Sequence, residues 1–178
     1  MQLEELFKIR QSCRNFDAER AVEREKLEKI MQLARLAPSA CNSQPYSFVV
    51  VTEADLVKSV AKCTQGMGMN RHCSSARAFI VMVEENAGLL AKTSGRLKDQ
   101  DYASIDMGIV SAHIVLAAAE QGLSTCMIGW FDEKKIKEVL GLEDKKRVRL
   151  VFAAGYAAAG DPVREKKRKD IEKLVTYR

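Results

Sequence analysis

Apolar positions in the first third of the chain repeat with helical spacing in two stretches. Residues 3, 6 and 7 are apolar and share one helical face with Arg10, which predicts a helix from Leu3 to Arg10 whose inward stripe ends in an arginine. A second helix is predicted from about Glu23 to Ala37, because Pro38 cannot continue it. Its buried side would carry Leu27, Ile30, Met31 and Ala34.

Continuous apolar runs predict the strands. Four are expected, at Tyr46 to Val51, Arg77 to Val83, Leu123 to Ile128 and Val148 to Ala154. Helices are expected between them, from a capping box formed by Thr52 and Asp55 to the glycines at 66 and 68, from Tyr102 to Gln121, and from an N-cap at Asp132 to Leu140. The polar segment 84–100 has no firm period and is either a long active-site loop or a short helix.

The longest predicted helix carries a regular apolar stripe. Its positions follow four-three-four-three spacing and are Ile105, Ile109, Ala112, Leu116 and Ala119. Small residues are frequent in this helix and would let another helix approach closely, so we expect a central, well-buried element. Helices and strands alternate with connections of varied length after two initial helices. The class is therefore α+β or α/β, a single domain over residues 1–178 with a mixed sheet of four to five strands wrapped by helices.

Composition narrows the setting of the protein. A chain of 178 residues that is 47% hydrophobic can form one globular domain. Its apolar segments fall short of the roughly 20 residues that cross a bilayer, and Glu4 and Glu5 stand where a signal peptide carries basic residues. We therefore expect a cytoplasmic protein without membrane contact. The five cysteines are odd in number and form no C-x-x-C pair, which argues against a disulfide framework and against a metal site.

The net charge of +5 is concentrated near the C-terminus, where residues 164–169 contain five cations. Such a run is a solvated surface, a nucleic-acid patch or a clamp for the phosphate of a small ligand. Nucleic-acid binding is disfavoured, because aromatic residues are not interleaved with the cations and no DNA- or RNA-binding motif is present.

Side chains that could perform catalysis by themselves are scarce. His72 and His113 are far apart in sequence, and the chain has neither a nucleophile elbow nor a Walker loop. The run from Gly66 to Gly68 begins like a dinucleotide fingerprint, but Arg71 occupies the position of its third glycine. Cations and amides without a nucleophile are typical of a protein that holds a cofactor which performs the reaction.

Phosphate is the natural anchor for such a cofactor. Arg10, Ser12 and Arg14 supply two cations and a hydroxyl from one short segment, and Lys166 and Arg168 could close over the same anion from the C-terminal side. A polar loop between Pro38 and Pro45 leads directly into the first strand and has the composition of a ligand-facing hinge.

Four segments together carry a family resemblance. Arg10–Phe16 (RQSCRNF), Ala37–Pro45 (APSACNSQP), Gly122–Asp132 (GLSTCMIGWFD) and Gly155–Tyr156 with Pro162 and residues 166–168 resemble the signature of the FMN-dependent nitroreductase family. Their order and spacing fit, and the resemblance covers nearly the whole chain. One departure is the absence of the lysine that larger members carry shortly after the asparagine matched by Asn70.

The resemblance implies an interlocked homodimer with FMN at the subunit interface and NADH or NADPH as electron donor. Arg10, Gln11 and Ser12 would contact the phosphate and ribityl chain, and Lys166 and Arg168 would complete the phosphate clamp. Arg14 would reach the pyrimidine edge of the flavin. Asn70, Ile128 and Gly129 would contact the ring system, and the other subunit would contribute Pro38, Ser39, Ala40, Asn42 and Gln44.

The implied activity is a ping-pong hydride transfer in which the flavin carries the chemistry and no side chain is catalytic. Its acceptors would be nitroaromatics, quinones or related small electron-poor compounds. Two alternatives stay open: a non-catalytic protein that binds FMN or a flavin-like ligand and, more remotely, a nucleic-acid-binding protein that uses the basic tail.

Overall fold

A four-stranded antiparallel sheet organises the protein. The computed structural model describes residues 2–178, and at residues 89, 90, 92, 94 and 96 it describes the backbone only. The strand order is β1-β2-β4-β3, so β1 and β3 form the edges. The strands are β1 (Tyr46–Val51), β2 (Ala78–Glu84), β3 (Ser124–Ile128) and β4 (Arg147–Gly155). The α+β class and all four strands are confirmed, and the parallel part of the expected mixed sheet is limited to a bridge between Ser12 and Thr125.

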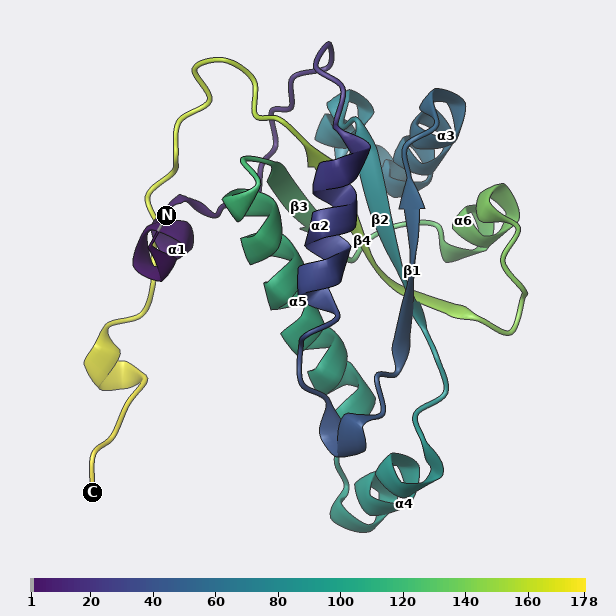
Figure 1. Ribbon diagram of the computed structural model, residues 1–178, viewed down its shortest axis with the longest axis vertical. Coiled ribbons are helices and arrows are strands. Elements are labelled where there is room, and N and C mark those ends of the chain that lie inside the picture. Colours follow the sequence, from purple (N-terminus) through teal and green to yellow (C-terminus); the bar gives the residue numbers. More distant parts are fainter. Residues whose placement is uncertain (1) are drawn as a thin grey trace.

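Helices cover both faces of the sheet, as Figure 1 shows. Side chains alternate along a strand, so Phe79 and Val81 of β2 pack with the cluster under α3 (Ala54–Thr64) and α6 (Glu133–Leu140). Ile80 and Met82 point to the other face and pack with the cluster under α2 (Arg24–Ala34) and α5 (Tyr102–Glu120). Because β2 is buried on both faces, its sequence reads as a continuous apolar run.

Three local expectations need correction or completion. The expected capping box at Thr52 is wrong, because α3 starts after Glu53 and has no side-chain cap. The segment 84–100 contains a short helix, α4 (Leu89–Lys98). The helix α1 (Leu3–Ile9) forms as expected, but none of its residues is buried, and Leu3 and Phe7 are 61% and 53% exposed. The inward stripe predicted for α1 is therefore left largely exposed, although α1 lies against α5.

The helix α5 forms over the predicted range but buries a different face. Its buried apolar side chains include Met107, Val110 and Ile114, whereas Ile105 of the predicted stripe is 49% exposed and Ala112 is also exposed. Of the stripe, Ala119 alone is buried. The remaining stripe positions form an apolar, partly exposed outer face of α5.

The helix α5 has 19 residues and a mean hydropathy of 1.5, which is the length and composition of a membrane-crossing helix. No segment of this kind was expected from the sequence. The helix lies along the sheet, however, and its buried face belongs to the cluster shared with β2 and β4. That placement is the one found for a core helix.

The last twenty residues leave the body of the protein. After β4 the chain runs past α1 and ends in a single 3-10 turn, η4 (Ile171–Lys173), as Figure 1 shows. The apolar side chains of this tail are exposed, with Ile171 and Leu174 each at 60% and Tyr177 at 91%. The tail therefore presents apolar surface that this chain does not cover.

Candidate active site

A basic cavity of about 250 Å³ lies where the N-terminal segment meets the C-terminal tail. The segment after α1 supplies one wall and the residues after β4 supply the other. The lining residues are Arg10, Gln11, Ser12, Arg14, Arg164, Glu165, Lys166 and Arg168. The structure thus brings together all six residues that the sequence assigned to the phosphate, the ribityl chain and the pyrimidine edge, from segments more than 150 positions apart.

Gln11 holds the two walls together. Its side-chain amide donates to the carbonyl of Pro162 at 3.1 Å, and its Oε1 accepts from the backbone N–H of Arg164 at 2.9 Å. The Arg164 guanidinium also donates to Oε1 at 3.2 Å. Both ends of the amide are therefore engaged, so Gln11 acts as a clasp between the segments.

The cavity carries uncompensated positive charge. Within residues 2–178, Arg164 pairs with Asp161 at 2.9 Å, whereas Arg10, Arg14, Lys166 and Arg168 form no ion pair with a carboxylate. Lys166 donates to the carbonyl of Lys8, and Arg168 donates to that of Lys167 at 2.8 Å. Glu165 is the one acid among the lining residues. Clustered cations of this kind repel one another, and a phosphate would relieve that repulsion.

The arginine segment runs beside the edge strand β3. Ser12 forms a parallel bridge with Thr125, and the N–H of Cys13 donates to the Thr125 carbonyl at 2.9 Å. Burial raises the pKa of the Cys126 thiol, and the charge of nearby Arg14 opposes that rise. Arg14 therefore lines the basic cavity and also lies close to Cys126 of β3, so the positive charge of the site extends beside that strand.

The end of β3 presents backbone to solvent. Ile128 is 2% exposed, so its side chain belongs to the core, while Gly129 and Trp130 are exposed. Asn70 holds this turn from the side, because its amide donates to the carbonyls of Trp130 at 3.0 Å and Thr64 at 3.1 Å. A planar ligand extending from the basic cavity past Arg14 would meet the backbone at Gly129.

The loop between the prolines adopts a strained conformation. Cys41, Asn42 and Gln44 have positive φ angles of 51°, 52° and 44° in a region that non-glycine residues rarely occupy. Ser39 Oγ accepts from the Gln44 N–H at 3.0 Å, and the Gln44 amide donates to Asn42 Oδ1 at 3.2 Å. The polar side chains of the loop thus bond mainly to one another.

This loop lies far from the basic cavity of its own chain. Ala40 contacts α5 at Asp106, near the start of the helix, whereas Arg10 lies beside Ala119 near its end. These two positions are 13 residues apart along the helix, which is about 20 Å at a rise of 1.5 Å per residue. Figure 1 shows the loop at the N-terminal end of α5, beside α4, and α1 toward the C-terminal end of α5. One chain therefore does not bring Pro38, Ser39, Ala40, Asn42 and Gln44 to the phosphate site.

Two residues at these sites were missed from the sequence. Arg164 lines the cavity, and the signal was its place in the basic run, from which only Lys166 and Arg168 were chosen. Asp106 holds the loop, and its signal was an acid between apolar residues in the second turn of a largely apolar helix.

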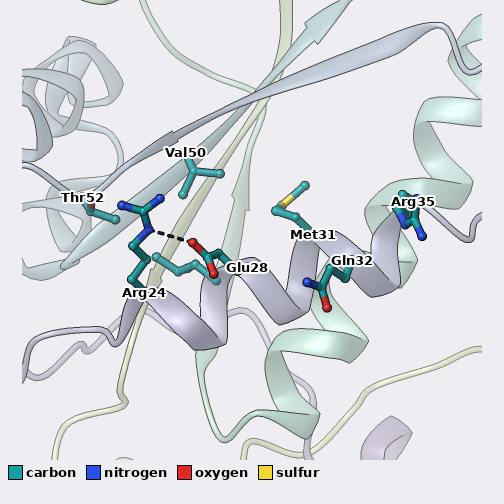
Figure 2. A pocket seen from close by; sticks show the side chains of 8 residues that line it. Arg24, Glu28, Met31, Gln32, Arg35, Val50 and Thr52 are labelled. Carbon is teal, nitrogen blue, oxygen red and sulfur yellow. Dashed lines mark hydrogen bonds and ion pairs between the residues drawn. The ribbon is translucent and has the colours of Figure 1, made fainter.

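A larger cavity of about 590 Å³ lies between α2 and the edge strand β1. Figure 2 shows Arg24 and Glu28 bonded to each other on α2, with Met31 along the helix, Val50 on the strand and Thr52 directly after its end. This cavity is separate from the basic site, because none of its lining residues was assigned to the cofactor and its Arg24 is paired with Glu28.

Comparisons with known proteins agree with the geometry. Residues 8–156 match the model of the family described as "Nitroreductase family". The chain is 26% identical to the oxygen-insensitive NADPH nitroreductase of Helicobacter pylori strain J99, over 97% of this chain and 95% of that protein. A nitroreductase family protein from Streptococcus pneumoniae superposes with a TM-score of 0.84 at 27% identity, covering 99% of this chain and 100% of that one. An FMN-dependent nitroreductase from Clostridium difficile matches with a TM-score of 0.74 at 26% identity, covering 98% of each chain.

Proposed function

The chain belongs to the nitroreductase family, and from that premise we propose that it is an FMN-dependent oxidoreductase that uses NADH or NADPH to reduce a small electron-poor acceptor. The acceptor would be a nitroaromatic, a quinone or a related compound, reduced in a ping-pong cycle. The observation that carries this proposal is the basic cavity, in which Arg10, Lys166 and Arg168 converge without carboxylate partners.

The residues present fit a flavin mononucleotide. A phosphomonoester carries nearly two negative charges, and arginine forks with a lysine and a serine hydroxyl are suited to bind it. Ligand sites usually measure about 300 to 1,000 Å³, so the cavity of about 250 Å³ would hold only the phosphate end of the cofactor. The ring system would extend past Arg14 toward Gly129.

The chain's own residues bind and orient the cofactor. When bound, FMN supplies hydride acceptance and hydride donation. Gln11 keeps the tail against the N-terminal segment, and Asn70 holds the turn at Trp130. Arg14, whose charge acts on Cys126 of β3, would place a positive charge beside the ring. Because no described side chain covers Gly129, one face would stay open to the dinucleotide and the acceptor in turn.

We infer in addition that the active unit is a homodimer, in which each FMN contacts the Pro38–Gln44 loop of the other subunit. The exposed apolar residues of α1, the outer face of α5 and the tail support this proposal, since a second copy could bury them. The separation of about 20 Å along α5 between the loop and the basic cavity also supports a site built from two chains, because one chain keeps the two parts apart.

Cofactor content and reduction test the proposal. Purified protein should be yellow and release FMN on denaturation, and NADH or NADPH should bleach the flavin under anaerobic conditions. Protein that neither retains FMN nor regains it on reconstitution would refute the cofactor assignment. Flavin that binds but is not reduced by either dinucleotide would instead support the non-catalytic alternative.

Mixed dimers test whether the site is shared. One parent carries Arg10→Ala with Arg168→Ala, and the other carries Asn42→Ala with Gln44→Ala, on differently tagged subunits that are co-expressed. In a mixed dimer one site contains both lesions and the other contains neither, so we expect one FMN per dimer at wild-type affinity. If each site came from a single chain, both sites of the mixed dimer would be impaired.

A further inference from the structure

An aspartate in the core of α5 supports the loop between the prolines. The backbone N–H of Ala40 donates to Oδ1 of Asp106 at 2.9 Å. Asp106 is 2% exposed and lies four residues into a helix whose neighbouring side chains are apolar. A buried carboxyl group with so few bonds destabilises the folded chain, so its presence calls for another explanation.

The surroundings of Asp106 are incompletely satisfied. Its second oxygen, Oδ2, is buried and has no hydrogen-bond partner among the described residues, and the same is true of the hydroxyls of Ser43 and Tyr46. Burial raises the pKa of Tyr46, and the charge of Asp106 adds to that rise, which puts the phenol in the field of the carboxyl group. Tyr46 and Asp106 are thus two unpartnered polar groups close to each other, and the hydroxyl of Ser43 is a third within the loop itself; each lowers stability without joining a complete network.

The loop above them needs such support. Its three left-handed residues, Cys41, Asn42 and Gln44, each raise the energy of the backbone. Among the described residues, the bond from Ala40 is the one hydrogen bond between the loop and a side chain of α5, and it is made by the first residue of the strained turn. Without that bond, the backbone of the loop would be less fixed, and so would the positions of the Asn42 and Gln44 side chains.

We propose that Asp106 is a positioning residue for the flavin site of the other subunit: it fixes the backbone of the Pro38–Gln44 loop and touches no cofactor itself. This inference rests on the proposed function and deepens it. Such a residue lowers the stability of the fold and improves the geometry of the ligand site. Removal of the buried carboxyl group should therefore leave the stability of the apoprotein unchanged or raise it, and should weaken FMN binding.

The test compares three variants with wild type by FMN fluorescence titration and by thermal unfolding of the apoprotein. Asp106→Leu retains a similar volume but no acceptor, and we expect the FMN Kd to rise at least tenfold with an unchanged or higher Tm. Asp106→Asn keeps an oxygen that can accept from Ala40 and should stay within threefold of the wild-type Kd. Asp101→Leu is the control, because Asp101 caps the same helix by accepting from the Ser104 N–H at 3.1 Å. It should lower Tm and leave the Kd unchanged.

Mixed dimers locate the effect. Asp106→Leu subunits paired with Arg10→Ala, Arg168→Ala subunits should regain one FMN site per dimer at wild-type affinity, because the two lesions would then fall in the same site. A wild-type Kd for Asp106→Leu, a Tm that falls together with binding, or a mixed dimer without a tight site would each overturn the inference. Those results would leave the FMN assignment intact, whereas a wild-type protein that binds no FMN would remove the proposed function itself.

Discussion

The side-chain amide of Asn70 donates to the carbonyl of Trp130 at 3.0 Å, across 60 positions of sequence. Asn70 has a φ of 53°, a left-handed conformation that asparagine tolerates better than most residues. The same nitrogen donates to Thr64 at the end of α3. Asn70 therefore ties α3 to the turn that follows β3, and so fixes the backbone of Gly129 relative to the rest of the domain.

Replacing Asn70 should separate its backbone and side-chain roles. Asn70→Ala loses both hydrogen bonds and keeps an unfavourable φ, so we expect a loss of about 2 to 3 kcal/mol of unfolding free energy. Asn70→Gly loses the same bonds without the backbone cost and should be about 1 kcal/mol more stable than the alanine variant. Urea denaturation measures both. Equal stability of the two variants would show that the left-handed backbone carries no cost here.

Gln11 gives a prediction about assembly of the basic cavity. Gln11→Ala removes the bonds to Pro162 and Arg164, so Lys166 and Arg168 should lose their fixed distance to Arg10. We expect FMN affinity to fall about tenfold, or about 1.4 kcal/mol, with a small change in Tm because the clasp is exposed. FMN titration checks this expectation, with Gln65→Ala as the control for a glutamine outside the cavity. If affinity is kept, the tail reaches the phosphate without the clasp.

Secondary structure was predictable where one signal dominated. Tyr46–Val51 forms a strand with the predicted bounds, and Asp132 caps α6 by accepting from the Lys135 N–H at 3.1 Å. The buried face of α5 was not predictable from its spacing, because apolar residues surround the helix and a stripe at Ile105 and Ile109 competes with one at Val110 and Ile114. Contact with the sheet decides between them, and that contact is a tertiary property.

The site was predictable in parts for a similar reason. Motifs identified the cationic residues, and the structure gathers them. The clasp formed by Gln11 and the bond from Ala40 to Asp106 join segments 151 and 66 positions apart. Neither bond leaves a local pattern in the sequence, so they become visible only when the chain is folded.

The outer face of α5 should determine dimer stability. Ile105→Glu places a charge in the proposed apolar interface, and an unpaired charge there would be strongly unfavourable. We expect a shift from dimer to monomer by analytical ultracentrifugation, with loss of bound FMN. Leu56→Glu is the matched control, since Leu56 is an exposed leucine on α3 across the sheet. A dimer that survives Ile105→Glu would show that this face does not form the interface.

Buried thiols should make stability fall at alkaline pH. Burial raises the pKa of Cys73 from 9.0 to about 11, and its side chain is 0% exposed. Because the folded pKa is the higher one, the unfolded chain releases this proton first, so stability is full below pH 9 and declines as pH rises toward 11. The loss attributable to Cys73 is at most about 3 kcal/mol. Comparing wild type with Cys73→Ala by urea denaturation at pH 8 and pH 10.5 isolates it, because the difference between the two proteins should shrink at the higher pH.

Gly129 offers the most direct test of where the ring system lies. A Cβ built on Gly129 meets no heavy atom within 4 Å, and its φ is not positive, so Gly129→Ala should change unfolding free energy by less than about 0.5 kcal/mol. A flavin ring against this backbone would collide with the added methyl, and FMN affinity should then fall at least tenfold. Gly88→Ala is the matched control, since a Cβ there also meets nothing within 4 Å and its φ is −54°. Both variants are compared by FMN titration and thermal unfolding. Because neither methyl meets an atom of its own chain, a loss of affinity confined to Gly129→Ala must arise from the cofactor or the second subunit, and equal affinities would move the ring system away from the end of β3.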